Sequence, residues 1–253
     1  QEDTRRSATS SPIRENIHSI ICAPIKSRDE VLGVIYFDTI WTATCFTKED
    51  LELLTAVGIQ LGTMLKNMEL TSSHHDLFMG IVRTLVNIIE AKDRYTLGHT
   101  ERVTRFSLAV GREMNLDPKT MDTLHISALM HDIGKVAAPE SILNKPGKLT
   151  DEEFAEIKKH PAVGVGFVRH IHRFGEITDG ILYHHERYDG RGYPTGASGE
   201  AIPFIARIIS VVDAFDAMTS DRPYRKSLST EKTMEELRKN RGTQFDGRIV
   251  DAF

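Results

Sequence analysis

Seven side chains that bind metals well lie scattered through the second half of this chain. Two adjacent pairs stand out, His131-Asp132 in the string HDIGK and His184-His185 at the start of HHERYDGRGYP. Imidazole and carboxylate ligands without a thiolate suit iron or manganese better than a structural zinc site. A pair of such metals commonly hydrolyses phosphate esters. The seven candidate metal ligands are His99, His131, Asp132, His160, His184, His185 and Asp213.

The residues after His131-Asp132 indicate a site for phosphate. Adjacent residues on a helix point about 100° apart, yet Asp132 can meet two metals because a carboxylate has two oxygens. Gly134 permits a close approach of the chain, and Lys135 places a positive charge one helical turn from the pair. An isolated His-Asp dipeptide is more often a solvated helix end, so the glycine and the lysine carry this prediction.

The His184-His185 pair follows an apolar stretch, where two imidazoles are costly to bury unless they are bound or hydrogen-bonded. An exposed pair is the ordinary alternative. The next residues, DGRGYP at 189–194, predict a sharply turning loop at the mouth of a site. Tyr193 in this loop either lines a substrate pocket or packs the loop.

The remaining candidates are weaker when taken singly. His99 and His160 would each more often be ordinary core or surface residues. Asp213 interrupts an apolar helical run, where a carboxylate needs a partner that a metal would supply. Asp216 lies three residues further on and is the alternative to Asp213.

The elements that must position these residues are mostly helical. Residues 17–40 predict two antiparallel strands. From about Thr47, which with Asp50 resembles a capping box, apolar residues recur at helical spacing to about Ala91. A helix this long, or two joined by a kink, often forms a dimer seam; packing against its own domain is the alternative. Beyond Ala91 the pattern predicts an all-α domain whose helices carry the candidate ligands inward.

Composition narrows the function further. The 253 residues carry 32 basic and 36 acidic side chains, a net charge of −4, so wholesale binding to DNA or membranes is not expected. Cys22 and Cys45 make no disulfide framework and predict a reducing, cytoplasmic setting. No apolar run approaches the ~18 residues that span a bilayer.

Taken together, these strings resemble the HD-GYP domain, a branch of the HD phosphohydrolase superfamily, from about residue 90 to 253. The resemblance runs through YTLGHTERV, ALMHDIGKVAAPESILNKPGKLTDEEF, HHERYDGRGYP and ARIISVVDAFDAMTSDRPYRK. It implies hydrolysis of the messenger cyclic di-GMP to pGpG and on to GMP. It also implies a centre of iron or manganese ions.

The same resemblance assigns roles to residues. Asp132 would bridge two metals, and with Lys135 it would be catalytic. His99 and Asp213 would complete the shell of the first metal around His131, and His160, His184 and His185 that of the second. The predicted substrate contacts are Lys135, Tyr193, Arg222 and Arg225.

One departure from the family concerns the number of metals. Some members place a glutamate four residues before the first histidine, where it binds a third metal. Here that residue is Tyr95. We therefore predict two metals and leave a third open.

The first part of the chain, about residues 12–70, resembles the C-terminal half of a GAF domain, through SIICAPIK, VLGVIYFDT and FTKEDLELLTAVGIQLGTML. We therefore expect a small α+β GAF-like segment over 1–70, incomplete for sensing, a connecting helix over 71–91, and an all-helical catalytic domain over 92–253. A homodimer through the first two parts is expected. Two alternatives remain: a signalling module that binds a cyclic dinucleotide or a partner without hydrolysis, and a hydrolase of cyclic GMP-AMP.

Overall fold

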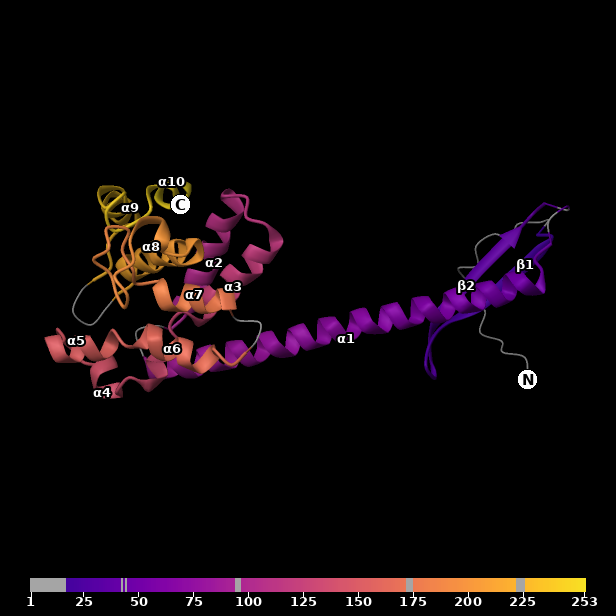
Figure 1. The fold of residues 1–253 in the computed structure, drawn as a ribbon, viewed down its shortest axis with the longest axis horizontal. Coiled ribbons are helices and arrows are strands. Elements are labelled where there is room, and N and C mark those ends of the chain that lie inside the picture. The colour runs from indigo at the N-terminus through magenta and orange to yellow at the C-terminus, as the bar shows by residue number, and fades with distance from the viewer. Residues whose placement is uncertain (1–16, 42, 44, 94–96, 172–174, 222–225) are drawn as a thin grey trace. The chain divides into compact units, whose positions relative to one another are not determined.

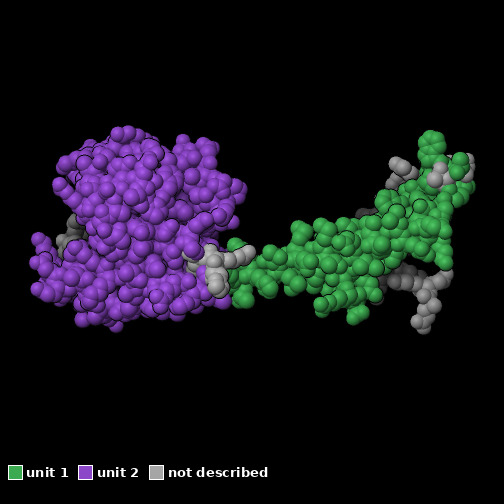
Figure 2. Space-filling model, in the orientation of Figure 1, with its two compact units in different colours: residues 1–78 green, residues 79–253 purple. Residues whose placement is uncertain are grey.

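A computed structural model describes residues 17–41, 43, 45–93, 97–171, 175–221 and 226–253. Within these residues the chain forms two compact units, residues 1–78 and 79–253 (Figure 2). The elements, shown in Figure 1, are β1 Ser19–Ser27, β2 Glu30–Thr39, α1 Lys48–Lys92, α2 His99–Glu113, α3 Pro118–Met130, η1 Ile133–Ala137, α4 Glu140–Leu143, α5 Asp151–Ile157, α6 His160–Val168, α7 Gly175–Tyr183, η2 Gly199–Ala201, α8 Phe204–Thr219, α9 Thr230–Lys239 and α10 Gly247–Ala252.

The first unit contains the β-hairpin and the first part of α1. Strands β1 and β2 pair antiparallel from Ser19 opposite Thr39 to the turn, which confirms the two predicted strands. Helix α1 lies very close to β1, because a Cβ at Gly58 would stand 2.3 Å from the carbonyl oxygen of Pro24. Only a glycine permits this approach. The small sheet and the long helix confirm the predicted α+β segment.

Helix α1 begins at the predicted capping box. The backbone N–H of Asp50 donates to Thr47 Oγ1 at 3.2 Å, and the backbone N–H of Thr47 donates to Asp50 Oδ2 at 2.7 Å. The helix then runs unbroken to Lys92, so residues 71–75 do not divide it. Among the helices in the described part of the chain, none has both the length and the apolarity needed to cross a bilayer.

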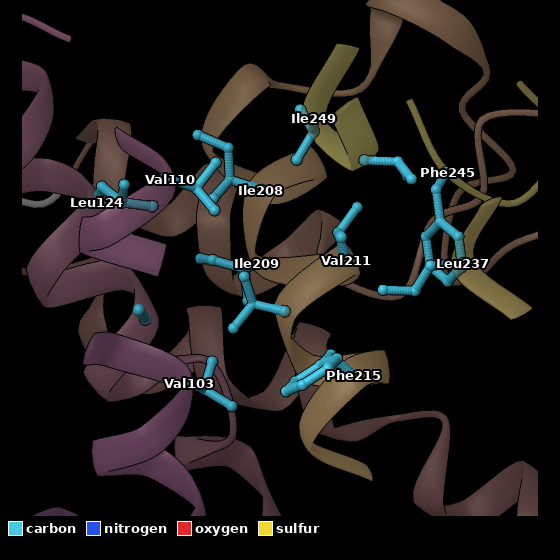
Figure 3. Packing of buried hydrophobic residues seen from close by; sticks show 13 residues of the cluster. Val103, Val110, Leu124, Ile208, Ile209, Val211, Phe215, Leu237, Phe245 and Ile249 are labelled. Atoms are coloured by element: carbon cyan, nitrogen blue, oxygen red, sulfur yellow. The ribbon is translucent and has the colours of Figure 1, made fainter. Parts of the chain in front are cut away.

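Where the structure describes it, the second unit consists of helices joined by loops, as predicted. Its core is built around α8, which contributes Ile208, Ile209, Val211, Val212 and Phe215 (Figure 3). Helices α2, α3, α9 and α10 add apolar side chains from the other sides. The end of α1 belongs to this unit too and buries Met79, Val82, Val86 and Ile89. Because the apolar face of α8 is buried in this core, the packing of that face fixes the position of the polar side chains that the helix carries.

Candidate metal centre

Six of the seven candidate ligands lie at the ends of helices. His99 is the first residue of α2, and His160 is the first residue of α6. The His131-Asp132 pair follows α3 directly, and the His184-His185 pair follows α7. Asp213 alone lies within a helix, on α8. Five helices thus deliver the set, and the contacts between them bring it together.

The side chains form two groups that share Asp132. One group holds His99, His131 and Asp132, the other Asp132, His160, His184 and His185, and the donor atoms of each group lie within 4.8 Å of one another. Asp132 Oδ2 lies 3.5 Å from His131 Nε2, whereas Asp132 Oδ1 lies 3.3 Å from His160 Nε2. The two carboxylate oxygens therefore face different groups, as they would in a ligand that bridges two metals.

The two aspartates of α8 contact opposite nitrogens of the His99 ring. Asp213 Oδ1 lies 3.3 Å from His99 Nε2, on the side of the first group. Asp216 Oδ2 lies 2.7 Å from His99 Nδ1, and Asp216 also accepts hydrogen bonds from Arg102. This arrangement would allow Asp213 to serve as a metal ligand and Asp216 to orient His99. Their i, i+3 spacing puts both on one face of α8.

Three of the histidine rings are fixed by backbone carbonyls. In each case Nδ1 lies within 2.8 Å of the carbonyl oxygen three residues earlier, in the last turn of the preceding helix. A carbonyl only accepts, so Nδ1 carries the hydrogen and Nε2 keeps its lone pair. Such carbonyls have no partner within their own helix. The pairs are His131 with Ala128, His160 with Ile157, and His184 with Ile181.

The free Nε2 atoms fit a metal site. His131 Nε2 is buried and has no hydrogen-bond partner among the described residues. His160 Nε2 and His184 Nε2 lie 3.2 Å apart, although neither carries a hydrogen when Nδ1 does. Two lone pairs that face each other in a buried site repel. A cation bound by both nitrogens would replace this repulsion with attraction. The donor set therefore suits metals that take nitrogen and oxygen ligands.

The protonation states of His184, His185 and Asp132 also suit metal binding. Burial, followed by the neighbouring imidazoles, lowers the pKa of His184 well below its ordinary value, and burial lowers the pKa of His185 to about 3 despite nearby Asp213. Both rings are therefore neutral near pH 7, as ligands must be. Burial opposes the charge on Asp132, but the nearby ammonium of Lys135 holds the pKa of this carboxyl well below its usual range.

Lys135 stands beside the bridging carboxylate. Its Nζ lies 2.6 Å from Asp132 Oδ2 and 3.8 Å from Asp93 Oδ2. Burial opposes its charge, but these two carboxylates raise the pKa of the lysine, which stays an ammonium. The close approach expected at Gly134 is present, because a Cβ there would stand 1.9 Å from the carbonyl oxygen of His160. The segment that follows Asp132 therefore packs directly against the start of α6, which carries His160 of the second group.

The loop after His185 folds back over the centre. The Tyr193 ring lies 4.8 Å from the His185 ring, at an interplanar angle of 31°. Burial, followed by the charges of Asp132 and Asp213, raises the pKa of the Tyr193 phenol, so its hydroxyl keeps its proton. Glu186 holds the far side of the loop, where its Oε1 accepts from the backbone N–H of Thr195 at 2.6 Å and of Gly196 at 3.1 Å.

Several supporting residues give no signal in the sequence. Glu90 on α1 accepts hydrogen bonds from the backbone N–H groups of Gly98 at 2.9 Å and Thr100 at 3.0 Å, on either side of His99. Lys92, also on α1, donates to the carbonyl oxygens of Val136 and Ala138. These contacts join a side chain to the backbone of another segment. Backbone groups are the same in every residue, so no sequence pattern predicts such contacts. The i, i+3 spacing of His99 and Arg102 is the one sequence signal, because it places on one helix face the two residues that contact Asp216.

Three residues predicted to bear on the site lie outside the described residues. They are Tyr95, where a third-metal ligand stands in some members of the family, and the two predicted phosphate contacts Arg222 and Arg225.

Comparisons with known proteins show the family of the chain. A family model described as the HD domain matches residues 83–249, and a GAF domain model matches residues 4–65. The chain is 41% identical over 170 residues to the cyclic di-GMP phosphodiesterase response regulator RpfG of Xanthomonas campestris, covering 66% of this chain and 45% of that protein. It is 36% identical over 160 residues to 3'3'-cGAMP-specific phosphodiesterase 1 of Vibrio cholerae, covering 63% of this chain and 37% of that protein.

The chain thus spans less than half the length of both relatives. Among solved structures, an HDG"Y"P protein from Bdellovibrio bacteriovorus has a similar fold, with a TM-score of 0.52 and 22% identity over 61% of this chain and 49% of that chain. The HD domain match covers more than half of the sequence and includes all seven candidate ligands. The chain belongs to the HD domain family.

Proposed function

We propose that this protein is a metal-dependent phosphodiesterase that hydrolyses cyclic di-GMP, with pGpG or GMP as the product. The observation that carries the proposal is the double group of donor atoms joined by the two oxygens of Asp132. Relatives named cyclic di-GMP phosphodiesterases at up to 41% identity support the choice of substrate.

Two metals, iron or manganese, would be held by seven residues. His99, His131 and Asp213 would hold the first, His160, His184 and His185 would hold the second, and Asp132 would contribute one carboxylate oxygen to each. When bound, the metals would supply Lewis acidity and activate a water for attack on a phosphodiester. The Nε2 atoms of His131, His160 and His184 are available to the metals, because their Nδ1 atoms are engaged by backbone carbonyls.

The side chains around the centre would bind the substrate and stabilise the charge that develops on its phosphate. Lys135 places its ammonium beside Asp132, where it stabilises negative charge on the phosphate during the reaction. Tyr193 lines the substrate site and offers a protonated hydroxyl near the carboxylates of Asp132 and Asp213. Arg222 and Arg225 complete the proposal as contacts of the phosphates, since the planar guanidinium fork matches phosphate oxygens.

The test is anaerobic hydrolysis of cyclic di-GMP by the Mn(II)- or Fe(II)-loaded protein, with products separated by chromatography. We expect pGpG or GMP, no product after metal removal, and a loss of at least about a hundredfold in kcat/KM in Asp132→Ala. Asp251→Ala removes an exposed carboxylate on α10 and serves as the control, with wild-type turnover. Wild-type rates in a folded, metal-loaded Asp132→Ala protein would refute the proposal.

A second candidate substrate is cyclic GMP-AMP, because a relative named as specific for that dinucleotide is 36% identical. The same assay run with both dinucleotides ranks them by kcat/KM. If a protein that contains two metals turns over neither, the better proposal is a module that binds a cyclic dinucleotide or a partner without hydrolysis.

We also propose that the protein is a homodimer through α1. Val57, Leu61, Met64 and Met68 recur at steps of four and three residues, and all four side chains are exposed. This is the spacing of a two-stranded coiled-coil seam. An exposed apolar row of this kind is stabilised by a partner with the same spacing, and a second copy of α1 provides one.

A further inference from the structure

A ladder of three rings leads outward from the proposed metal ligand His185. Tyr193 stacks on His185, and Phe154 meets Tyr193 edge to face, with ring centroids 6.4 Å apart and an interplanar angle of 81°. Phe154 is 44% exposed. A large aromatic ring that is open to solvent at this distance from a phosphate-cleaving centre is a surface on which a nucleobase can stack.

Lys158 lies over the outer end of this ladder. Its Nζ is 4.6 Å from the centre of the Phe154 ring and 5.4 Å from that of Tyr193. Neighbouring lysines are paired with carboxylates, Lys145 with Glu153 and Lys159 with Glu156. Within the described part of the chain, no carboxylate lies within ion-pair distance of Lys158, so its charge is available to an anion.

The short helix α5 carries this surface. Thr150 and Glu153 form a capping box at its start, and the helix ends at Ile157, three residues before His160. Phe154 lies on α5 and Lys158 is its C-cap, so both lie on the segment that leads into a proposed metal ligand.

We propose that Phe154, Lys158 and Tyr193 form a subsite for one purine nucleotide unit of the substrate. This inference rests on the proposed function and assigns one half of the dinucleotide to a place. The base packs against Phe154 and the edge of Tyr193. Lys158 leaves the rings and pairs with a phosphate oxygen. The exchange is favourable because a base stacked on an aromatic ring outweighs an exposed cation–π contact.

Two matched pairs of variants test the subsite in the Mn(II)-loaded protein. Phe154→Leu is compared with Phe167→Leu, which alters another exposed phenylalanine, on α6. Lys158→Met is compared with Lys159→Met, its neighbour that is paired with Glu156. The probes are GMP and ribose 5-phosphate, which lacks a base, and their affinities are measured by calorimetry.

We expect Phe154→Leu to raise the Kd for GMP about tenfold and to leave that for ribose 5-phosphate unchanged. Lys158→Met weakens both probes, and the two controls weaken neither. In turnover of cyclic di-GMP, Phe154→Leu raises KM with little change in kcat, which loss of structure would not produce. Thermal melts check that each variant is folded.

The two proposals fail separately. If the wild-type protein hydrolyses cyclic di-GMP while Phe154→Leu keeps wild-type KM and GMP affinity, the subsite is overturned and the phosphodiesterase stands. The subsite is also overturned if the metal-loaded wild-type protein does not bind GMP. If GMP binds with the expected dependence on these residues but no dinucleotide is cleaved, the subsite stands and the hydrolytic function falls.

Discussion

The His99 ring shows how single contacts set the chemistry of the centre. Asp216 accepts from Nδ1 at 2.7 Å, and Nε2 on the other side of the ring faces Asp213 and the first group. Burial opposes charge on Asp216, but its hydrogen bonds from His99 and Arg102 lower its pKa to about 2. Asp216 therefore remains a carboxylate near pH 7 and fixes the orientation of the ring. Burial opposes charge on His99, but Asp216, Asp213 and Asp132 raise the pKa of its imidazole.

Replacing Asp216 by asparagine tests this arrangement. We expect Asp216→Asn to weaken one of two bound Mn(II) ions about 10–100-fold, because the residue that orients a metal-binding histidine has lost its charge. The ion at the second group keeps its affinity, since Asp216 contacts none of those ligands in the described structure. Calorimetric titration of the metal-free protein with Mn(II) measures both events.

Asp189→Asn is the matched control, because Asp189 also accepts two hydrogen bonds from one arginine, Arg187, but contacts no candidate ligand in the described structure. Unchanged affinity for both ions in a folded Asp216→Asn protein would show that the orientation of the His99 ring is set in another way.

At the scale of elements, helix ends do most of the positioning. A helix end leaves carbonyls unpaired, and here three imidazoles satisfy such carbonyls while their other nitrogen points into the centre. The same contact thus completes a helix and orients a ligand. A second close approach, of Gly134 to the carbonyl of His160, brings α6 against the residues that follow Asp132, and it requires the absence of a side chain at Gly134.

The contact between α8 and α10 gives a prediction about pH. Asp246 caps α10 through the backbone N–H of Arg248 and accepts from Arg207 Nη1 on α8 at 2.6 Å, with both side chains of this pair buried. Burial opposes its charge, but the bonds from Arg248 and Arg207 lower its pKa below the ordinary 3.8. The folded state therefore holds its proton less tightly than the unfolded state.

A depressed carboxyl pKa stabilises the fold above pH 3.8, and this contribution is lost as the pH falls through the lower folded value. We expect Asp246→Asn to reduce the free energy of unfolding at pH 7 by about 2 kcal/mol, since a buried charged hydrogen bond is lost while the cap is kept. The difference from wild type shrinks below pH 3.8. Urea unfolding from pH 7 to 3 measures it.

Asp251→Asn provides the comparison, because it breaks the exposed pair with Arg241 and is expected to cost little. A difference between Asp246→Asn and wild type that stays constant down to the lowest pH would contradict the assignment.

At the scale of the whole molecule, the proposed dimer is the main question. We expect sedimentation equilibrium to give twice the 28.5 kDa chain mass for the wild-type protein. Leu61→Glu places a charge in the proposed seam and should raise the dimer Kd by at least about tenfold, because two glutamates then face each other across it. Thr63→Glu lies off the seam on the same exposed helix and should leave the mass unchanged.

A monomeric wild-type protein at micromolar concentration would exclude the seam. Equal masses for Leu61→Glu and Thr63→Glu, both dimeric, would place the dimer contact elsewhere.

The sequence by itself determined the fold class and the identity of the candidate ligands. Helical spacing, the Thr47–Asp50 capping box and the two strand segments specify local structure, because they act through neighbours within a few residues. The strings HDIGK and HHERYDGRGYP indicated a metal site because few other uses explain those residues together. Residues 71–75 were the one ambiguous stretch, where helix propensity alone could not decide whether α1 continues.

Only the tertiary structure decided how the residues share the work. Asp213 and Asp216 are equivalent by spacing, and packing of the apolar face of α8 turns them to opposite nitrogens of His99. Glu90, Phe154 and Lys158 acquire their proposed or observed roles through partners that lie in other elements. Such contacts depend on where whole helices come to rest, which is set by the summed burial of many apolar side chains rather than by any local pattern.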